Sequence, residues 1–179
     1  MNSHIKNNVD FICIGAQKAG TTWLYSRLNE LPEFNLPYKK ELHYFDRYKK
    51  YPSPNMLSEN SLLKKATNIN WIRNLSRDYI GMFNDVGYDK RKLAWLNKFY
   101  FSNYNASWYL SLFDDFDGIT GDITPSYSIL DLQGVQEMYE TIPNVKLIFL
   151  LRNPIDRAWS HFRYSLKNKS FLQQKKAIE

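Results

Sequence analysis

The sequence predicts an α/β fold in which a central, mostly parallel sheet is flanked by helices. Two short apolar runs, Asp10–Gly15 and Val145–Leu151, are typical of strands that are buried on both faces. Each run is followed by a loop and a helical pattern, and such strand–loop–helix units build parallel sheets. The chain has 179 residues, 44% of them hydrophobic, which is enough for one domain with a sizeable core.

The elements of the first half differ in how clearly they are patterned. After the loop 16–20, apolar residues recur at helical spacing over Thr21–Leu31, and Pro32 ends this helix. Residues 47–105 are weakly patterned, and helices are expected only around 60–82 and 89–101. Their aromatic residues could stack on a sugar, although a role in the core is the expected one. These aromatics are Trp71, Trp95, Tyr100, Tyr104 and Trp108.

The second half is patterned more regularly. We expect a helix over Trp108–Phe116, a strand over Gly118–Thr124 and a helix over Leu130–Ile142. After the strand Val145–Leu151, Asn153 suits an N-cap and Pro154 the first helical position. That last helix is expected to run to about Asn168 and to bury four side chains, Ile155, Trp159, Phe162 and Leu166.

Charge and composition exclude several classes of protein. The net charge is +6, and residues 105–140 carry seven Asp or Glu and no Lys or Arg. The basic residues therefore come from the two ends of the chain, which predicts a basic, anion-attracting region. One cysteine excludes an intrachain disulfide framework and a Cys-rich zinc site. No run approaches the ~20 apolar residues of a membrane span. We expect a cytoplasmic protein with no nucleic-acid or membrane partner, and its oligomeric state stays open.

The loop after the first strand carries the first chemical signal. Gly15 and Gly20 lie five residues apart, and the hydroxyl residues Thr21 and Thr22 open a helix. This is the frame of a phosphate-binding loop, in which backbone N–H groups and the helix N-terminus attract an anion. The fold expected is therefore three-layered and P-loop-like. A nucleoside-triphosphate loop has lysine directly after the second glycine, whereas the lysine here is Lys18, which argues against an ATPase, GTPase or kinase.

Two further motifs have side chains suited to anion binding and proton transfer. Arg152 stands where the last strand ends and Ser160 about two helical turns later, so that both could grip one phosphate. The segment 39–46 holds two lysines with Glu41 and His43, either of which could act as a general base. Each motif alone also has a structural interpretation: a tight turn, an arginine at a helix end, a solvated loop.

Together the three motifs resemble the sulfotransferase family that uses 3′-phosphoadenosine 5′-phosphosulfate (PAPS) as sulfuryl donor. Residues 15–22 resemble its 5′-phosphosulfate loop, including the displaced lysine, and Val145–Leu151 with Arg152 and Ser160 resembles its 3′-phosphate motif. Residues 40–45 and 121–127 are similar to segments of the carbohydrate (heparan-sulfate-type) branch. Ile123 departs from that branch, many members of which have a lysine there.

The resemblance implies sulfuryl transfer from PAPS, without a metal, to an acceptor hydroxyl or amine, with a carbohydrate as the expected partner. It implies catalytic roles for Lys18 and for a base, Glu41 as first choice and His43 as second. The residues it implies for donor binding are Gly15, Lys18, Ala19, Gly20, Thr21, Thr22, Arg152 and Ser160.

Two other functions stay open, a P-loop kinase or nucleotide hydrolase and a truncated, non-catalytic anion-binding module. Family members usually continue beyond the 3′-phosphate helix, whereas this sequence ends at Glu179. The expected domain is therefore residues 1–179, either as it stands or short of the family's C-terminal segment.

Overall fold

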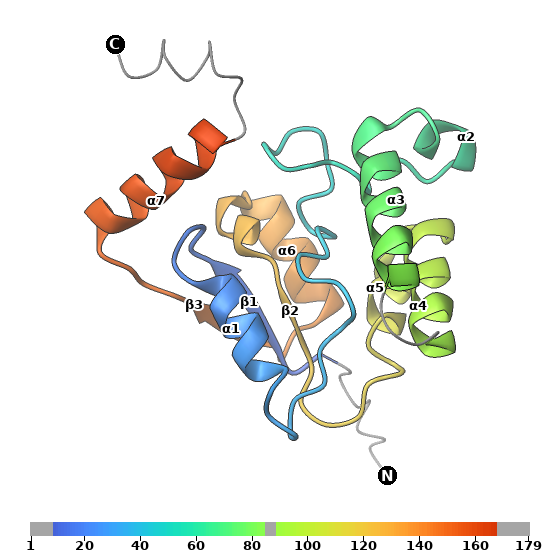
Figure 1. Ribbon diagram of the computed structural model, residues 1–179, viewed down its shortest axis with the longest axis horizontal. Helices are drawn as coiled ribbons and strands as arrows, with labels where there is room; N and C mark the ends of the chain where they lie inside the picture. Colours follow the sequence, from blue (N-terminus) through green and yellow to red (C-terminus); the bar gives the residue numbers. More distant parts are fainter. Residues whose placement is uncertain (1–8, 85–88, 168–179) are drawn as a thin grey trace.

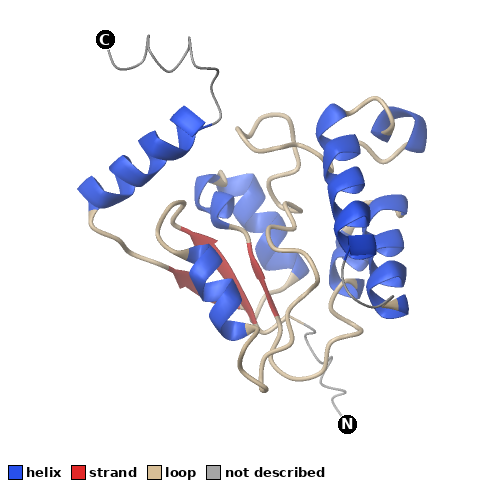
Figure 2. Ribbon diagram, viewed as in Figure 1, coloured by secondary structure: helices blue, strands red, loops and turns tan. Residues whose placement is uncertain are grey.

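The computed structural model describes residues 9–84 and 89–167 and shows a three-stranded parallel sheet with helices on both faces (Figures 1 and 2). The strand order is β2-β1-β3, with β1 (Phe11–Gly15) between β2 (Gly121–Ile123) and β3 (Lys146–Phe149). In register, Ile12 lies opposite Asp122 on one side and Leu147 on the other. The predicted α/β class with a parallel sheet is thus confirmed.

The alternation of side chains along β1 defines the layers. Phe11 and Cys13 point to one face, where they pack with Leu24 and Leu28 of helix α1 (Thr21–Leu28). Ile12 points to the other face, into the main core. That core includes side chains of α6 (Leu132–Thr141) and of the helices between β1 and β2. Cys13 itself is completely buried at the centre of the sheet.

The weakly patterned middle of the chain supplies much of the main core. Its helices are α2 (Leu62–Lys65), α3 (Ile69–Asn84), α4 (Lys90–Phe101) and α5 (Ala106–Ser111). The five aromatic residues considered for sugar stacking are each 5% exposed or less. Their place in the core is confirmed, and none of them presents a free ring to an acceptor. The hydrophobic periodicity of the sequence is weak here because these aromatic side chains, rather than a stripe of aliphatic ones, pack in the core.

The remaining elements connect the core to the site. A 3₁₀-helix, η1 (Pro125–Ile129), follows β2 directly, and α7 (Pro154–Lys167) follows β3 through the segment 150–153. The expected helix 21–31 ends at Leu28, the expected helix 108–116 lies at 106–111, and the expected strand 118–124 keeps only its residues 121–123. Among the helices of the described residues, none has the length and apolarity that crossing a membrane requires.

The expected burial of the last strand and helix is wrong in the structure. Leu147 is 57% and Phe149 49% exposed, and on α7 Ile155 is 79% and Trp159 59% exposed. Phe162 is 37% exposed, and Leu166 is half-buried. The reason is that β3 pairs only with β1 within the described residues, and α7 leads away from the sheet (Figure 1). We call β3 and α7, residues 146–167, the C-terminal arm.

Candidate active site

The loop between β1 and α1 has the geometry of an anion-binding turn. Gly20, which precedes the first residue of α1, has φ 104°, a left-handed conformation that glycine adopts at little cost. No side chain caps this end of α1, so the N–H groups of its first turn are available to an anion. Gly15 lies beneath the loop, where an added Cβ would come within 2.8 Å of the Phe149 ring.

One cavity of about 490 Å³ brings the three sequence motifs together. The donor loop, the segment around Glu41 and the C-terminal arm each line part of its wall. The lining residues are Gln17, Lys18, Gly20, Thr21, Thr22, Lys40, Glu41, Pro125, Arg152, Ser160, His161 and Tyr164. Of the predicted site residues, only Gly15, Ala19 and His43 do not line the cavity.

The donor loop and the C-terminal arm touch directly. Arg152 Nη1 donates a hydrogen bond to the backbone oxygen of Lys18 at 3.1 Å. The Lys18 ammonium lies over the ring of Tyr164 on α7, 4.3 Å from its centroid, in a cation–π contact. The predicted N-cap of α7 is present, because the Asn153 side chain accepts hydrogen bonds from the N–H groups of Ile155 and Asp156. The basic residues of the cavity thus come from both ends of the chain, as expected.

A strained backbone presents Glu41 to the cavity. Glu41 and His43 have φ of 63° and 57°, a region that costs a non-glycine residue roughly 1–2 kcal/mol. The segment is held in this conformation by side chains of residues that follow β2. The Leu42 N–H donates to Thr124 Oγ1 at 2.9 Å, and the Tyr44 N–H donates to the Tyr127 hydroxyl oxygen at 2.9 Å.

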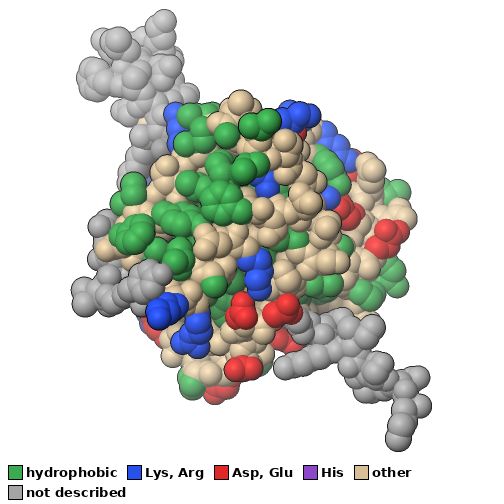
Figure 3. Space-filling view, turned by 90° about the vertical axis from the view of Figure 1, so that its right-hand side faces the viewer, with side chains coloured by type: hydrophobic (Ala, Val, Ile, Leu, Met, Phe, Trp, Pro, Cys, Tyr) green, Lys and Arg blue, Asp and Glu red, His purple; other side chains and the backbone are tan. Residues whose placement is uncertain are grey.

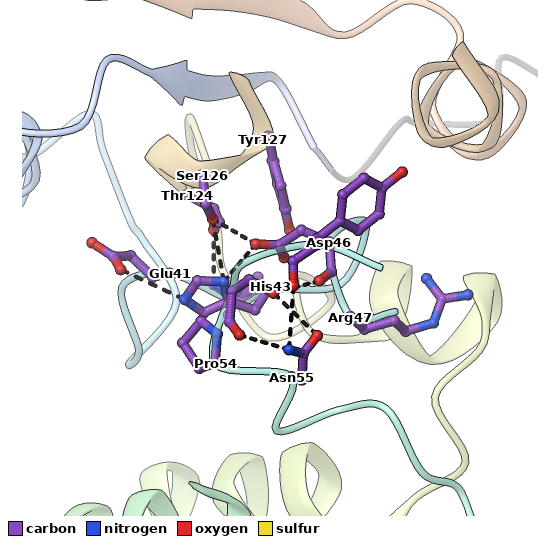
Figure 4. Close-up of polar contacts among 12 residues, drawn as sticks. Glu41, His43, Asp46, Arg47, Pro54, Asn55, Thr124, Ser126 and Tyr127 are labelled. Carbon is purple, nitrogen blue, oxygen red and sulfur yellow. Dashed lines mark hydrogen bonds and ion pairs between the residues drawn. The ribbon is translucent and has the colours of Figure 1, made fainter. Parts of the chain in front are cut away.

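His43 lies between two carboxyl groups, as Figure 4 shows. Its Nδ1 is 2.9 Å from Asp46 Oδ2, and its Nε2 is 3.6 Å from Glu41 Oε2. Burial alone lowers the pKa of His43, but the hydrogen bonds with Asp46 and Glu41 outweigh burial and raise the pKa to about 9. The imidazole is therefore held as a cation and faces away from the cavity, behind Glu41.

The same contacts keep Glu41 ionised. Burial raises the pKa of Glu41, but hydrogen bonds from His43 and from the neighbouring Lys40 ammonium dominate and lower the pKa to about 2. Asp46 is completely buried and accepts a hydrogen bond from Ser126 Oγ at 2.6 Å. Its second oxygen, Oδ1, has no hydrogen-bond partner. The carboxylate facing the cavity thus depends on a buried chain of groups that runs from Ser126 through Asp46 and His43.

A second buried carboxyl group supports this chain. Asp122 in β2 accepts hydrogen bonds from Thr124 Oγ1 at 2.6 Å and from the Tyr127 and Tyr109 hydroxyls at 2.9 and 3.2 Å. Burial raises the pKa of Asp122 to about 6, against the lowering effect of these hydrogen bonds. Thr124 and Tyr127 are the two groups that hold the segment 42–44. Asp122 orients both of them and therefore helps to position Glu41 indirectly.

Sequence reasoning missed several of these residues. Asp46 lies within the segment 39–46 but was not predicted to take part in the site. Its position three residues after His43 could have indicated that the two side chains interact. Tyr164 lies about one helical turn after Ser160, and a helical projection would have placed the two side chains on the same face. Nothing local in the sequence connects Ser126 to His43, since the contact spans 83 residues. Among the described residues, no group of three or more His, Cys, Asp or Glu could hold a metal ion.

Comparisons with known proteins agree with this architecture. The sequence model of the sulfotransferase family matches residues 10–178. The chain is 25% identical over 158 residues to the membrane-associated sulfotransferase kil1 of Dictyostelium discoideum, covering 88% of this chain and 23% of that protein. The crystal structure of a sulfotransferase from Alicyclobacillus acidocaldarius matches with a TM-score of 0.53 and 23% identity, over 92% of this chain and 54% of that one. The chain thus spans about a quarter of the curated relative and about half of the solved structure. On the extent of the family match, the chain belongs to the sulfotransferase family.

Proposed function

We propose that the protein transfers a sulfuryl group from PAPS to an acceptor hydroxyl or amine, and that the acceptor is a carbohydrate. The observation that carries the proposal is that one cavity joins the loop of Lys18, the pair Arg152 and Ser160, and the ionised Glu41. Such a site offers two sets of anion-binding groups to a nucleotide that is anionic at both ends, and a carboxylate in the same cavity. The resemblance of residues 40–45 to the carbohydrate branch supports the choice of acceptor.

The residues present fit the charges of the donor. Lys18, the hydroxyls of Thr21 and Thr22 and the N–H groups at the start of α1 would hold its 5′-phosphosulfate end. Arg152 and Ser160 would hold the 3′-phosphate and so distinguish PAPS from ordinary adenine nucleotides. Both sets of residues line the same cavity, which agrees with a single ligand that contacts both.

In the proposed reaction, Glu41 accepts the proton of the acceptor hydroxyl or amine as the acceptor atom forms its bond to sulfur. The bond from sulfur to the bridging oxygen breaks, and its electron pair stays on the 5′-phosphate. Lys18 stabilises the negative charge that develops on that oxygen. Bound anionic groups close to Glu41 raise its pKa from its low value, which makes the carboxylate a better base.

His43, the second choice as base, receives a different role. Its ring does not line the cavity, and its raised pKa of about 9 means that it already carries a proton at neutral pH. We therefore propose that His43 positions Glu41 and that Glu41 is the base. The buried, unpaired Cys13 fits the proposed cytoplasmic location, where thiols stay reduced.

The test combines a binding titration with a turnover assay using labelled PAPS and a panel of acceptors. We expect 3′-phosphoadenosine 5′-phosphate to bind far better than ATP, with or without magnesium. The variant Lys18→Ala should lose about 100-fold or more in turnover, with its free energy of unfolding unchanged. Lys90→Ala, which removes an exposed lysine outside the cavity, is the matched control and should keep full turnover.

Each other outcome identifies a rival function. Unchanged turnover in Lys18→Ala would remove the donor-loop assignment. Tight binding of ATP with magnesium would favour a kinase or nucleotide hydrolase. Binding of inorganic sulfate but of neither nucleotide would favour a non-catalytic anion-binding module.

A further inference from the structure

The outward face of α3 is apolar although nothing in the described structure covers it. Ile69, Ile72, Ile80 and Phe83 are 55%, 37%, 60% and 70% exposed. Their spacing of three, eight and three residues places them on one side of the helix, opposite the buried Trp71 and Met82. Packing in the core accounts for the buried apolar side of α3 but not for the exposed one.

Helix α2 extends this surface. Leu62 and Leu63 are 57% and 82% exposed, and α2 is joined to α3 by only three residues. Figure 3 shows hydrophobic side chains gathered in the upper part of this face of the molecule, with Lys and Arg side chains at its upper rim. We call the six exposed side chains the α2–α3 surface: Leu62, Leu63, Ile69, Ile72, Ile80 and Phe83. None of them lines the cavity of the candidate active site.

The polar groups around the α2–α3 surface are cationic. Lys64, Arg73 and Arg77 are exposed beside it. The only acidic residue of 61–84 is Asp78, which is mostly buried and paired with Lys39. An exposed apolar stripe flanked by basic residues is the pattern of a helix that lies in the surface of an anionic membrane.

The C-terminal arm also exposes apolar side chains, but its chemistry differs. Its strand β3 has one edge without a partner in the described residues, and the unpaired N–H and C=O groups of an edge are costly in lipid. The backbone of α3 satisfies its own hydrogen bonds along the helix. Of these two surfaces, the α2–α3 surface is the one that combines apolar side chains and basic neighbours without an adjoining unpaired strand edge.

We propose that the α2–α3 surface docks this protein on the headgroup region of an anionic phospholipid membrane. A second copy of the chain is the less suitable occupant, because pairing this face with itself would bring Lys64 and Arg73 of two molecules together. The one acidic residue of 61–84, Asp78, is already paired with Lys39 and Arg77. This proposal differs from the sequence-based expectation of no membrane partner, which rested on the lack of a long apolar run; an interfacial helix needs no such run.

The test is co-sedimentation of the full chain with vesicles of phosphatidylcholine alone or with about 30% phosphatidylserine. We expect binding to the anionic vesicles only, weakening as salt rises. Ile80→Ser/Phe83→Ser should reduce partitioning about tenfold or more, and Lys64→Gln/Arg73→Gln about 20-fold. The matched control is Leu151→Ser/Ile155→Ser, which removes two exposed apolar side chains of the C-terminal arm, 86% and 79% exposed. It should bind like the unchanged protein.

Three outcomes would overturn the proposal. The first is no binding to anionic vesicles, and the second is equal loss of binding in the control and the Ile80/Phe83 variant. The third is a dimer in sedimentation velocity that Ile80→Ser/Phe83→Ser dissociates, which would assign the face to a second copy. Circular dichroism of each variant confirms that these surface changes leave the fold intact.

Discussion

The two walls of the cavity are built in opposite ways. The wall that presents Glu41 is part of the packed core, and its polar groups form a continuous network from Asp122 to His43. The wall that presents Arg152 and Ser160 is the C-terminal arm, whose apolar side chains are largely exposed. The arm is joined to the core by the pairing of β3 with β1, and beyond that strand Arg152 donates a hydrogen bond to the Lys18 backbone.

The difference separates two tasks of the site. Proton transfer needs a carboxylate that is fixed in place and kept ionised, and a buried network supplies both. Binding of a phosphate needs charge at the right position, which an exposed arginine and serine provide without a large core. We therefore expect changes in the core wall to affect folding and chemistry, and changes in the arm to affect ligand affinity alone.

The largest contrast is expected between two tryptophans. Trp95 is completely buried and its indole N–H donates to the Leu112 oxygen at 2.8 Å, whereas Trp159 on α7 is 59% exposed. Trp95→Ala should lower the free energy of unfolding by about 4 kcal/mol, and Trp159→Ala by about 1 kcal/mol or less. Urea denaturation measures both. Equal losses would show that the arm is packed as tightly as the core.

The next effect concerns Asp46, which positions His43. Asp46→Asn should lower the free energy of unfolding by about 3 kcal/mol, because it leaves the buried imidazolium without its anionic partner. It should also lower turnover, since His43 then holds Glu41 less firmly. The control Asp115→Asn breaks an exposed ion pair with Lys98 and should cost under about 1 kcal/mol.

The pH dependence of this variant distinguishes positioning from simple packing. The pKa of His43 is raised from its ordinary 6.5 to about 9, so its contribution to stability is complete below pH 6.5 and is lost as pH rises through about 9. The stability difference between the unchanged protein and Asp46→Asn should follow the same course. A difference that stays constant across this range would contradict the role assigned to the His43–Asp46 pair.

A smaller effect is expected on the arm at Arg152. Arg152→Ala should weaken binding of 3′-phosphoadenosine 5′-phosphate about 30-fold and leave the free energy of unfolding unchanged. Adenosine 5′-phosphate, which lacks the 3′-phosphate, should lose no affinity. Arg157→Ala, an exposed arginine of α7 that does not line the cavity, is the matched control. Equal weakening of both nucleotides would place Arg152 elsewhere in the site.

The smallest effect is expected at Ser160. Removing its hydroxyl as Ser160→Ala should weaken binding of the 3′-phosphorylated nucleotide about fivefold, the effect of one hydrogen bond. Isothermal titration beside Arg152→Ala measures whether the two losses add. A loss in the double variant that differs from the sum of the two single losses would indicate that both groups bind the same phosphate.

The parts of the fold that the sequence predicted are those with local signals. Apolar runs marked the strands, glycines marked the turn before α1, and Asn153 with Pro154 marked the start of α7. The weakly patterned middle could not be placed, because its helices are fixed by aromatic side chains that meet only after folding, such as Trp71 of α3 packed edge-on against Tyr100 of α4.

The candidate site follows the same rule. Lys18, Glu41, Arg152 and Ser160 could be selected because each lies in a local motif, and the structure brings them to one cavity. The support of Glu41 depends on Asp122 and Ser126, which are about 80 residues away along the chain, so no local pattern connects them. The error about the buried arm has a similar origin. An apolar run predicts a preference for burial, but whether another element covers it is decided by the rest of the polypeptide.

The single cysteine of the chain has a practical consequence. Cys13 is completely enclosed in β1, and burial raises the pKa of its thiol, so it stays unreactive while the protein is folded. The chain is therefore a natural background for site-directed labelling. Cysteines introduced at the exposed Ser26 of α1 and Arg157 of α7 could carry a pair of fluorescent dyes. Energy transfer between them would follow the distance from core to arm as a nucleotide is added.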